Sequence, residues 1–236
     1  MDFSQYSFNP VDHEFLQDPY PAFAYLRDKD PVHWSDLGLW VVTRFEDCRA
    51  TLVGKHFGQG DFVKNIQLFY GDDFDVMSHP SYAWLSRVFV MQDPPAHTRV
   101  RGLVSGALSL KRIRAMEQRI RQLAVQLLDD FDRSGSENFI TDFAYQFPTR
   151  VMCDMLGMSD EEYPPELLLK LNQAIADSFI VFETRALSQA ELDRADSQMR
   201  FLTGVFDELF ARRRAHPEDD LTTAMLQSQE GGDTLT

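Results

Sequence analysis

The sequence predicts a mainly α-helical fold with one small antiparallel β element. Over residues 110–133 the apolar residues recur at helical spacing, and Arg, Glu and Gln occupy the opposite face. The apolar positions are Ile113, Met116, Ile120, Leu123, Leu127 and Phe131. Two short runs rich in aromatic and β-branched residues, 31–34 and 39–43, flank turn residues, a pattern typical of a β-hairpin.

The elements before residue 93 are predicted from their start and stop signals. The Asp-Pro-Tyr-Pro sequence at 18–21 begins a helix that runs to about Asp28. A second helix covers 45–53, where Gly54 ends it. Asn, Gly and Asp punctuate residues 54–80, which predicts a long loop with one turn of helix near 66–70. Loops of that length inside compact domains are often functional. A short helical segment is expected over 81–87.

The remainder of the chain is predicted to be almost wholly helical. A helix over about 142–156 ends at Gly157, and Pro148 within it predicts a kink. The sequence Ser-Asp-Glu-Glu at 159–162 is typical of a helix-starting turn. Three more helices are expected, over about 164–182, 188–214 and 221–228.

Composition limits the function classes. The 236 residues suffice for one large domain or two small ones. The net charge of −14 argues against general nucleic-acid binding, which needs a basic surface. The two cysteines, Cys48 and Cys153, suggest a reducing compartment and inert buried thiols. The sequence contains no long apolar run and no signal-peptide pattern, so we expect a cytoplasmic protein without a membrane anchor.

Known catalytic and metal-binding patterns are absent from the sequence. The six histidines lack metal-ligand spacing such as HExxH. There is no glycine-rich phosphate loop, GxSxG elbow or Ser/His/Asp pattern. By burial frequencies alone, Phe179, Ile180 and Phe182 are more typical of a core than of a ligand site.

One stretch, residues 93–104 (DPPAHTRVRGLV), stands out as a helix start with a surplus of positive charge. Asp93 is a suitable N-cap, and Pro94 suits the first helical position. His97 and Arg101 are four residues apart and therefore share one helix face. Cations are mildly unfavourable near a helix N-terminus, so the pair would make sense against a bound anion. A merely solvated basic face is the alternative that spacing leaves open.

Residues 93–104 closely resemble the D-P-P-x-H-T-R-x-R-x-L-V motif of the cytochrome P-450 family, the haem-thiolate monooxygenases, in their soluble bacterial form. Leu108 stands where the family usually has Phe. Residues 18–23 resemble the family's first helix, and 40–47 resemble the strand before its second helix. The segment 188–221, with its Arg-rich end and Asp-Asp-Leu, resembles the long G helix and the start of the next helix. The resemblance covers essentially the whole chain, as a single partial domain over 1–236 that contains the A to H helices.

The resemblance implies roles for particular residues. His97 and Arg101 match the residues that hold the haem propionates, so haem is the expected cofactor. The region between Gly54 and Met91 would cover the substrate pocket, and 179–182 would lie near a mobile lid. Phe89, Val90, Phe179 and Phe182 are the candidate substrate contacts.

The resemblance also implies an activity that the chain alone lacks. The intact protein would insert one oxygen atom from O₂ into an apolar small molecule, by hydroxylation or epoxidation, with electrons from a ferredoxin or flavoprotein. No segment of residues 1–236 resembles the family's I helix or the helix that carries its E-x-x-R pair, and the F-x-x-G-x-x-x-C-x-G stretch with the thiolate ligand is not found. We therefore expect a fragment that is inactive alone. The alternative is a naturally truncated, non-catalytic relative that binds an apolar ligand or a protein partner.

Overall fold

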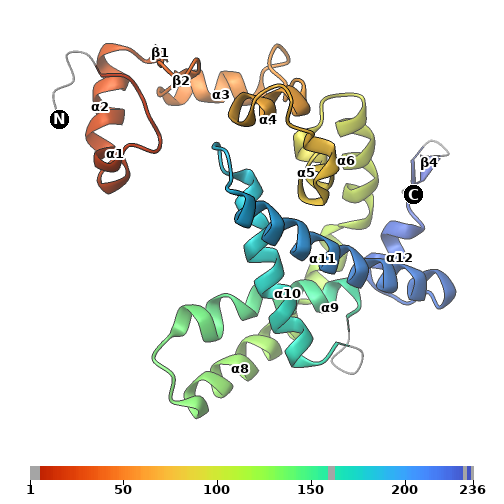
Figure 1. Ribbon diagram of the computed structural model, residues 1–236. Coiled ribbons are helices and arrows are strands. Elements are labelled where there is room, and N and C mark those ends of the chain that lie inside the picture. Colours follow the sequence, from red (N-terminus) through yellow and green to blue (C-terminus); the bar gives the residue numbers. More distant parts are fainter. Residues whose placement is uncertain (1–5, 159–162, 231–232, 235–236) are drawn as a thin grey trace. The chain divides into compact units, whose positions relative to one another are not determined.

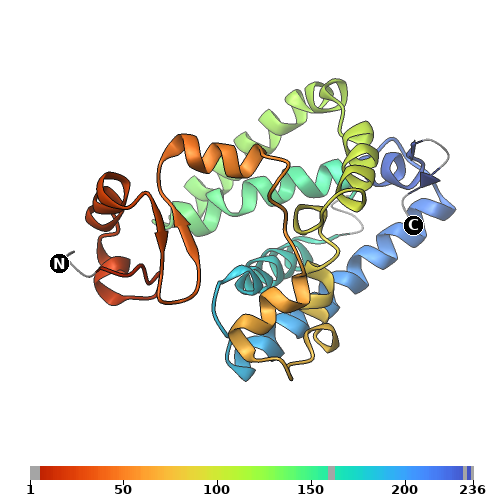
Figure 2. The same cartoon turned by 90° about the horizontal axis from the view of Figure 1, so that it is seen from above.

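The computed structural model describes residues 6–158, 163–230 and 233–234, which form two compact units (Figures 1 and 2). Unit 1 comprises residues 1–58 and unit 2 comprises residues 59–236. The predicted turn at 159–162 lies outside the described residues. The expectation of a single domain stays a prediction.

Unit 1 contains three helices and a hairpin among its described residues. The helices are α1 (His13–Gln17), α2 (Tyr20–Lys29) and α3 (Phe45–Val53). The hairpin pairs β1 (Val32–Trp34) with β2 (Trp40–Val42) in antiparallel register, with Trp34 opposite Trp40. The predicted hairpin and the second helix, including its end at Gly54, are confirmed. The short helix α1 was not predicted, although Asp12 caps it by accepting a hydrogen bond from the Phe15 amide (3.1 Å).

The first half of unit 2 leads into the helix that carries His97 and Arg101. Its elements are α4 (Phe62–Tyr70), the 3₁₀ turn η1 (Val76–Ser78), α5 (Pro80–Leu85), the 3₁₀ turn η2 (Phe89–Met91), and then α6 (Ala96–Ala107). The helical turn predicted near 66–70 is confirmed, but the loop predicted around it over 54–80 is too long, because nine of those residues form α4. The Asp61 side chain caps α4 by accepting from the Lys64 amide (3.2 Å).

The second half of unit 2 is helical apart from a short hairpin. The elements are α7 (Leu110–Ala115), α8 (Glu117–Ser134), the π-helical turn η3 (Ile140–Ala144), α9 (Gln146–Leu156), α10 (Pro165–Ser178), the 3₁₀ turn η4 (Phe179–Phe182), α11 (Gln189–Ala215), α12 (Leu221–Leu226), and β3 (Gln229–Glu230) paired with β4 (Asp233–Thr234). The single helix predicted over 110–133 is interrupted at Met116. Pro148 falls in the first turn of α9, where its missing N–H costs no helical hydrogen bond. The helix predicted over 142–156 is instead divided before Pro148, where the π-helical turn η3 gives way to α9.

The long helix α11 organises the packing of unit 2. Its N-terminal half packs in a cluster with α5, η1 and η4, which includes Val76, Tyr82 and Leu192. Its C-terminal half packs with α9 and α10 in a second cluster, which includes Cys153, Leu171 and Leu209. Figures 1 and 2 both show α10 beside α11. The buried faces of these helices therefore meet along α11, and a cavity lies beside Met199, Leu202 and Phe206 of the second cluster.

Two glycines in unit 2 are expected to respond oppositely to substitution by alanine. Gly157 ends α9 with a φ of +81°, and an added Cβ would overlap the Asp220 carboxylate. Gly157→Ala should therefore lower the free energy of unfolding by about 2 kcal/mol or more. Gly204 lies within α11, where a Cβ would meet nothing within 4 Å. Gly204→Ala should raise the free energy of unfolding by about 0.5–1 kcal/mol. Urea denaturation followed by circular dichroism measures both changes, and a stabilised Gly157→Ala variant would contradict the account.

Candidate functional site

The side chain of His97 is oriented by a backbone carbonyl. Its Nδ1 lies 2.8 Å from the carbonyl oxygen of Phe89, and the two rings contact each other edge to face at 5.6 Å. Because a carbonyl oxygen can only accept, Nδ1 carries the proton and donates this bond. Nε2 is then the ring nitrogen available to another group. The 3₁₀ turn η2 thus fixes both the direction and the tautomer of a half-buried imidazole.

Arg101 lies one helical turn after His97 on the exposed face of α6. Among the described residues, its guanidinium has no hydrogen-bond or ion-pair partner. Leu103, two residues later and about 200° around the helix axis, is 2% exposed and faces the core. The predicted placement of His97 and Arg101 on one face of a helix is consistent with this arrangement. Arg101 presents nitrogen donors, and Nε2 of His97 also donates when both ring nitrogens carry a proton. In that form the face suits a ligand that offers oxygen acceptors, such as a carboxylate.

Asp93 does not have the role that the sequence predicted. The helix α6 begins at Ala96, so Pro94 is not its first residue and Asp93 is not its N-cap. The Asp93 carboxylate instead accepts hydrogen bonds from the backbone amides of Gln59 (2.8 Å) and Gly60 (3.1 Å). Asp93 therefore ties the segment before α4 to the entrance of α6. The prediction failed because Asp-Pro-Pro looks like a cap locally, whereas the competing amides are more than thirty residues away in the sequence.

A second candidate site is an apolar cavity of about 470 Å³ within unit 2. Phe179 and Phe182 both line it, and their rings stack with centroids 5.4 Å apart. The 3₁₀ turn η4 causes this stacking, because residues three apart eclipse one another in a 3₁₀ helix. The other lining residues are Trp84, Ile175, Ser178, Met199, Leu202, Thr203, Phe206, Asp207 and Phe210.

The structure does not place the four candidate substrate residues together. Phe179 and Phe182 share the cavity, but Phe89 packs against His97, and Val90 is 51% exposed beside it. Sequence reasoning missed Trp84 and Phe210 as cavity residues. For Phe210 the signal was an extension of the apolar stripe of α11, at helical spacing from Met199 and Phe206. For Trp84 no local signal existed, because its exposure to the cavity depends on how α5 packs.

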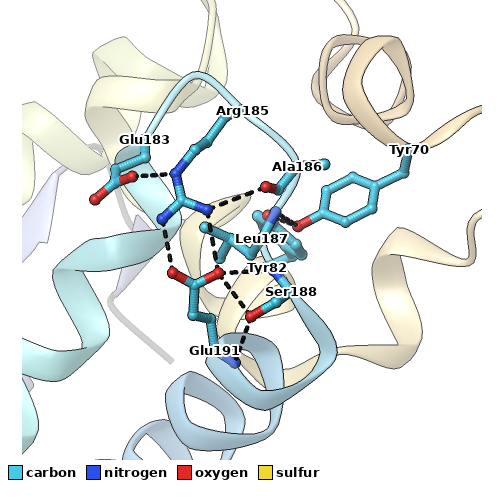
Figure 3. Close-up of polar contacts among 8 residues, drawn as sticks. All are labelled: Tyr70, Tyr82, Glu183, Arg185, Ala186, Leu187, Ser188 and Glu191. Carbon is cyan, nitrogen blue, oxygen red and sulfur yellow. Dashed lines mark hydrogen bonds and ion pairs between the residues drawn. The ribbon is translucent and has the colours of Figure 1, made fainter. Parts of the chain in front are cut away.

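The segment that connects η4 to α11 is fastened at several points (Figure 3). The Arg185 guanidinium donates to both carboxylate oxygens of Glu191 (2.7 and 3.1 Å) and to Glu183 (2.6 Å). The Leu187 amide donates to the hydroxyl of Tyr70 (2.7 Å), which is also bonded to the Tyr82 hydroxyl (3.0 Å). The segment that follows Phe182, in the region expected near a mobile lid, is therefore held to α11 by Arg185 and to α4 by the hydroxyl of Tyr70.

The Arg185 pairing changes the titration of Glu191. Hydrogen bonds from the Arg185 guanidinium, and then from Ser188, lower the pKa of Glu191 to about 2. Ser188 and Glu191 also form a reciprocal capping box at the start of α11. Burial, with help from the Tyr70 hydrogen bond, raises the pKa of Tyr82 above its ordinary value.

Glu191→Gln is expected to remove part of the acid sensitivity of the protein. Because folding lowers the pKa of Glu191, its ionised form stabilises the protein above the ordinary value of 4.5, and this stabilisation is lost as pH falls toward about 2. The difference in urea midpoint between wild type and Glu191→Gln should therefore be largest at neutral pH and shrink across this range. Glu208→Gln, exposed on the same helix, is the control. A constant difference from pH 7 to pH 2 would contradict the role of the pairing.

The two cysteines lie in different surroundings. The Cys48 thiol donates to the carbonyl oxygen of Val42 (3.2 Å), and Cys153 is 6% exposed in the core of unit 2. The described residues contain no group of three or more His, Cys, Asp or Glu side chains that could hold a metal ion. Within the same ranges, no helix is both long and apolar enough to cross a membrane.

Comparisons with known proteins find relatives over nearly the whole chain. No family model matches the sequence. The chain is 28% identical over 226 residues to the vitamin D(3) 25-hydroxylase of Pseudonocardia autotrophica, covering 94% of this chain and 51% of that protein. It is 28% identical over 230 residues to cytochrome P450 107B1 of Saccharopolyspora erythraea, covering 95% and 53%.

A comparison of structures agrees with the comparison of sequences. The crystal structure of P450BioI in complex with an acyl carrier protein ligated to hexadec-9Z-enoic acid superimposes with a TM-score of 0.76. The match covers 94% of this chain and 54% of that chain at 23% identity, so it shows the fold alone. The chain spans about half the length of the curated relatives it matches. In sequence and in fold, the chain is therefore similar to the N-terminal portion of cytochrome P450 proteins.

Proposed function

We propose that this chain supplies the propionate-binding face and part of the substrate cavity of a haem-dependent monooxygenase. The observation that carries the proposal is the α6 face, where an oriented His97 lies one helical turn from Arg101, which is exposed and has no partner among the described residues. Haem ends in two propionate carboxylates, which accept hydrogen bonds and carry negative charge. The nitrogen donors of His97 and Arg101 fit such acceptors.

In this proposal each residue has a limited task. The carbonyl of Phe89 holds the His97 ring so that Nε2 points away from η2, and a protonated Nε2 donates to a carboxylate. Arg101 supplies a planar, permanently charged fork. Haem with an axial thiolate, when bound, supplies the activation of O₂. The residues of this chain bind and orient the cofactor and enclose the substrate.

We propose that the axial thiolate comes from outside residues 1–236 and that the chain alone does not run the reaction. The Cys48 thiol donates a hydrogen bond to a backbone carbonyl, and Cys153 is packed in the core. The test is to add haem and a reductant to the chain, saturate with CO, and record the absorption spectrum. We expect no red-shifted Soret band of thiolate ligation. A red-shifted band that disappears in Cys48→Ala or Cys153→Ala would overturn this part of the proposal.

The substrate is proposed to be an apolar small molecule, which the protein hydroxylates or epoxidises. The support is the cavity of about 470 Å³, lined mainly by aromatic and aliphatic side chains that include Phe179 and Phe182. Phe89 has a different use in the structure, as the partner of His97. Phe179 and Phe182 are therefore better supported as substrate contacts than Phe89 and Val90.

The electron donor is proposed to be an acidic ferredoxin or flavoprotein. The short helix α7 carries Lys111, Arg112 and Arg114, and of these Lys111 and Arg114 are exposed. A local basic surface on a chain with a net charge of −14 would speed encounter with an acidic partner. At low ionic strength, the rate of electron transfer from the donor should be lower in Lys111→Ala/Arg114→Ala than in wild type. Equal rates would contradict this assignment.

The cavity also supports a second candidate function, which is binding of an apolar ligand without catalysis. The two functions differ in their dependence on haem. A fluorescent apolar dye such as 8-anilinonaphthalene-1-sulfonate should bind the chain under either function. Failure of the chain to bind haem, combined with saturable dye binding that Phe182→Ala weakens, would favour the non-catalytic function.

A further inference from the structure

A buried carboxylate joins α11 to the helix that forms one wall of the cavity. The side chain of Asp196 is 7% exposed, and its neighbours on the buried face of α11 include Leu192 and Met199. An ionised carboxylate in such a place is costly unless hydrogen-bond donors satisfy it. The identity of those donors therefore indicates what the residue does.

Among the described residues, the hydrogen-bond donors to Asp196 are His79 and Ser81, at the start of α5. The backbone amide of Ser81 donates to Oδ1 (3.0 Å), as does the Ser81 hydroxyl, and Nδ1 of His79 lies 2.8 Å from Oδ2. Ser81 is the second residue of α5, and the helix has no side-chain cap from its own N-cap residue, His79. Asp196 thus supplies from another helix the acceptor that an N-cap residue normally provides. The two positions are more than a hundred residues apart in sequence.

The helix α5 contributes to two cavities. Trp84 lines the large cavity with Phe182, and the next residue, Leu85, lines a smaller one of about 170 Å³ between α4 and η4. Phe182 lines both cavities. The ring of His79 stacks on Phe74 (5.0 Å, 12°), which adds a second attachment at the start of the helix. A rotation or shift of α5 would therefore change the walls of both cavities together.

We propose that Asp196 is a positioning residue that fixes α5 against α11 and thereby sets Trp84 in the cavity wall. A carboxylate offers only acceptors, so it can serve the Ser81 amide, the Ser81 hydroxyl and His79 at once. Asparagine keeps one acceptor oxygen for Ser81 but places an NH₂ group where the second oxygen was. The inference rests on the proposed function only for the use of the cavity as a ligand site. The position of Trp84 can be measured without a ligand.

The test uses Trp84 as a reporter. The chain contains Trp34, Trp40 and Trp84, so Trp34→Phe/Trp40→Phe leaves Trp84 as the only tryptophan. In this background Asp196→Ala should increase acrylamide quenching of Trp84, which is 39% exposed, by up to about twofold, and shift its emission to the red. Asp193→Ala is the matched control, because Asp193 lies on the exposed face of the same helix and contacts only Gln189 among the described residues (2.9 Å).

Conservative variants separate positioning from general loss of stability. Asp196→Asn should lie between wild type and Asp196→Ala in quenching, and Ser81→Ala should give a small increase because the backbone amide remains bonded. These two variants also provide the test if Asp196→Ala fails to fold. Unchanged Trp84 quenching in a folded Asp196→Ala, or in both milder variants, would overturn the proposal.

A ligand measurement distinguishes failure of this inference from failure of the proposed function. The dye 8-anilinonaphthalene-1-sulfonate should bind Asp196→Ala several-fold more weakly than Asp193→Ala. Equal dye affinities in these two variants would overturn the link between Asp196 and the cavity. If the wild-type chain binds no dye, the ligand role of the cavity fails, while the quenching of Trp84 still decides the positioning role.

Discussion

Replacing Arg213 by alanine should lower the free energy of unfolding by about 3–5 kcal/mol, because the substitution leaves a buried carboxylate without its counter-charge. The Arg213 side chain is 3% exposed and the Asp220 side chain 7% exposed. Arg213 bonds to Asp220 and to the carbonyl oxygen of Gly157, and it pairs with Glu218 at 3.1 Å. It therefore joins the end of α9 to the start of α12.

The effect of Arg213→Ala extends to the capping of α12. Asp220 uses its other oxygen to cap α12, by accepting from the Thr223 amide (2.7 Å). Without Arg213 the same carboxylate remains buried with fewer donors. Urea denaturation monitored by circular dichroism gives the change, and Arg214→Ala, the exposed neighbour, should change stability by no more than about 0.5 kcal/mol. A loss below about 1 kcal/mol for Arg213→Ala would show that the cluster is not a structural junction.

Substituting both His97 and Arg101 by alanine should weaken binding of haem by at least about tenfold, equal to about 1.4 kcal/mol. Each residue is expected to donate a charge-assisted hydrogen bond to a propionate, and such bonds contribute about 1.5–3 kcal/mol. Neither substitution should disturb the core, because Arg101 is exposed and the imidazole bonds only to the Phe89 carbonyl within the described residues.

Absorbance titration of the chain with haemin measures this loss. Thr98→Ala is the matched control, since Thr98 is exposed on the same turn of α6. Each single variant should lose part of the affinity for haemin. Because an arginine side chain is charged at every accessible pH, Arg101→Ala should weaken binding throughout the pH range. Retention of full affinity by the double variant would show that haemin binds elsewhere on the chain.

Local sequence signals predicted much of the secondary structure. The end of α3 at Gly54 was predicted, and α11 and α12 start within one residue of the predicted positions 188 and 221, where Ser188 and Asp220 cap them. The helix α4 was the main error, although Asp61 and the apolar residues after it carry a helix signal. The surrounding glycines and aspartates gave that region the composition of a loop.

The candidate site was only partly predictable for a different reason. Helical spacing placed His97 and Arg101 on one face, but the resemblance to a family was needed to choose between an anion site and a solvated surface. The contacts that orient or enclose the site join distant residues: Asp93 with Gly60, Tyr70 with Leu187, and Asp196 with His79. Such contacts depend on tertiary packing, and no periodicity in the sequence encodes them.

The central claim, that the His97 and Arg101 face binds the propionates of haem, is tested most directly by comparing haemin with haemin dimethyl ester. The ester has the same ring and metal but no carboxylate charge. The account predicts that the wild-type chain binds haemin at least about tenfold more tightly than the ester, and that His97→Ala/Arg101→Ala binds the two with similar affinity. Equal affinities of the wild-type chain for haemin and its ester would contradict the claim.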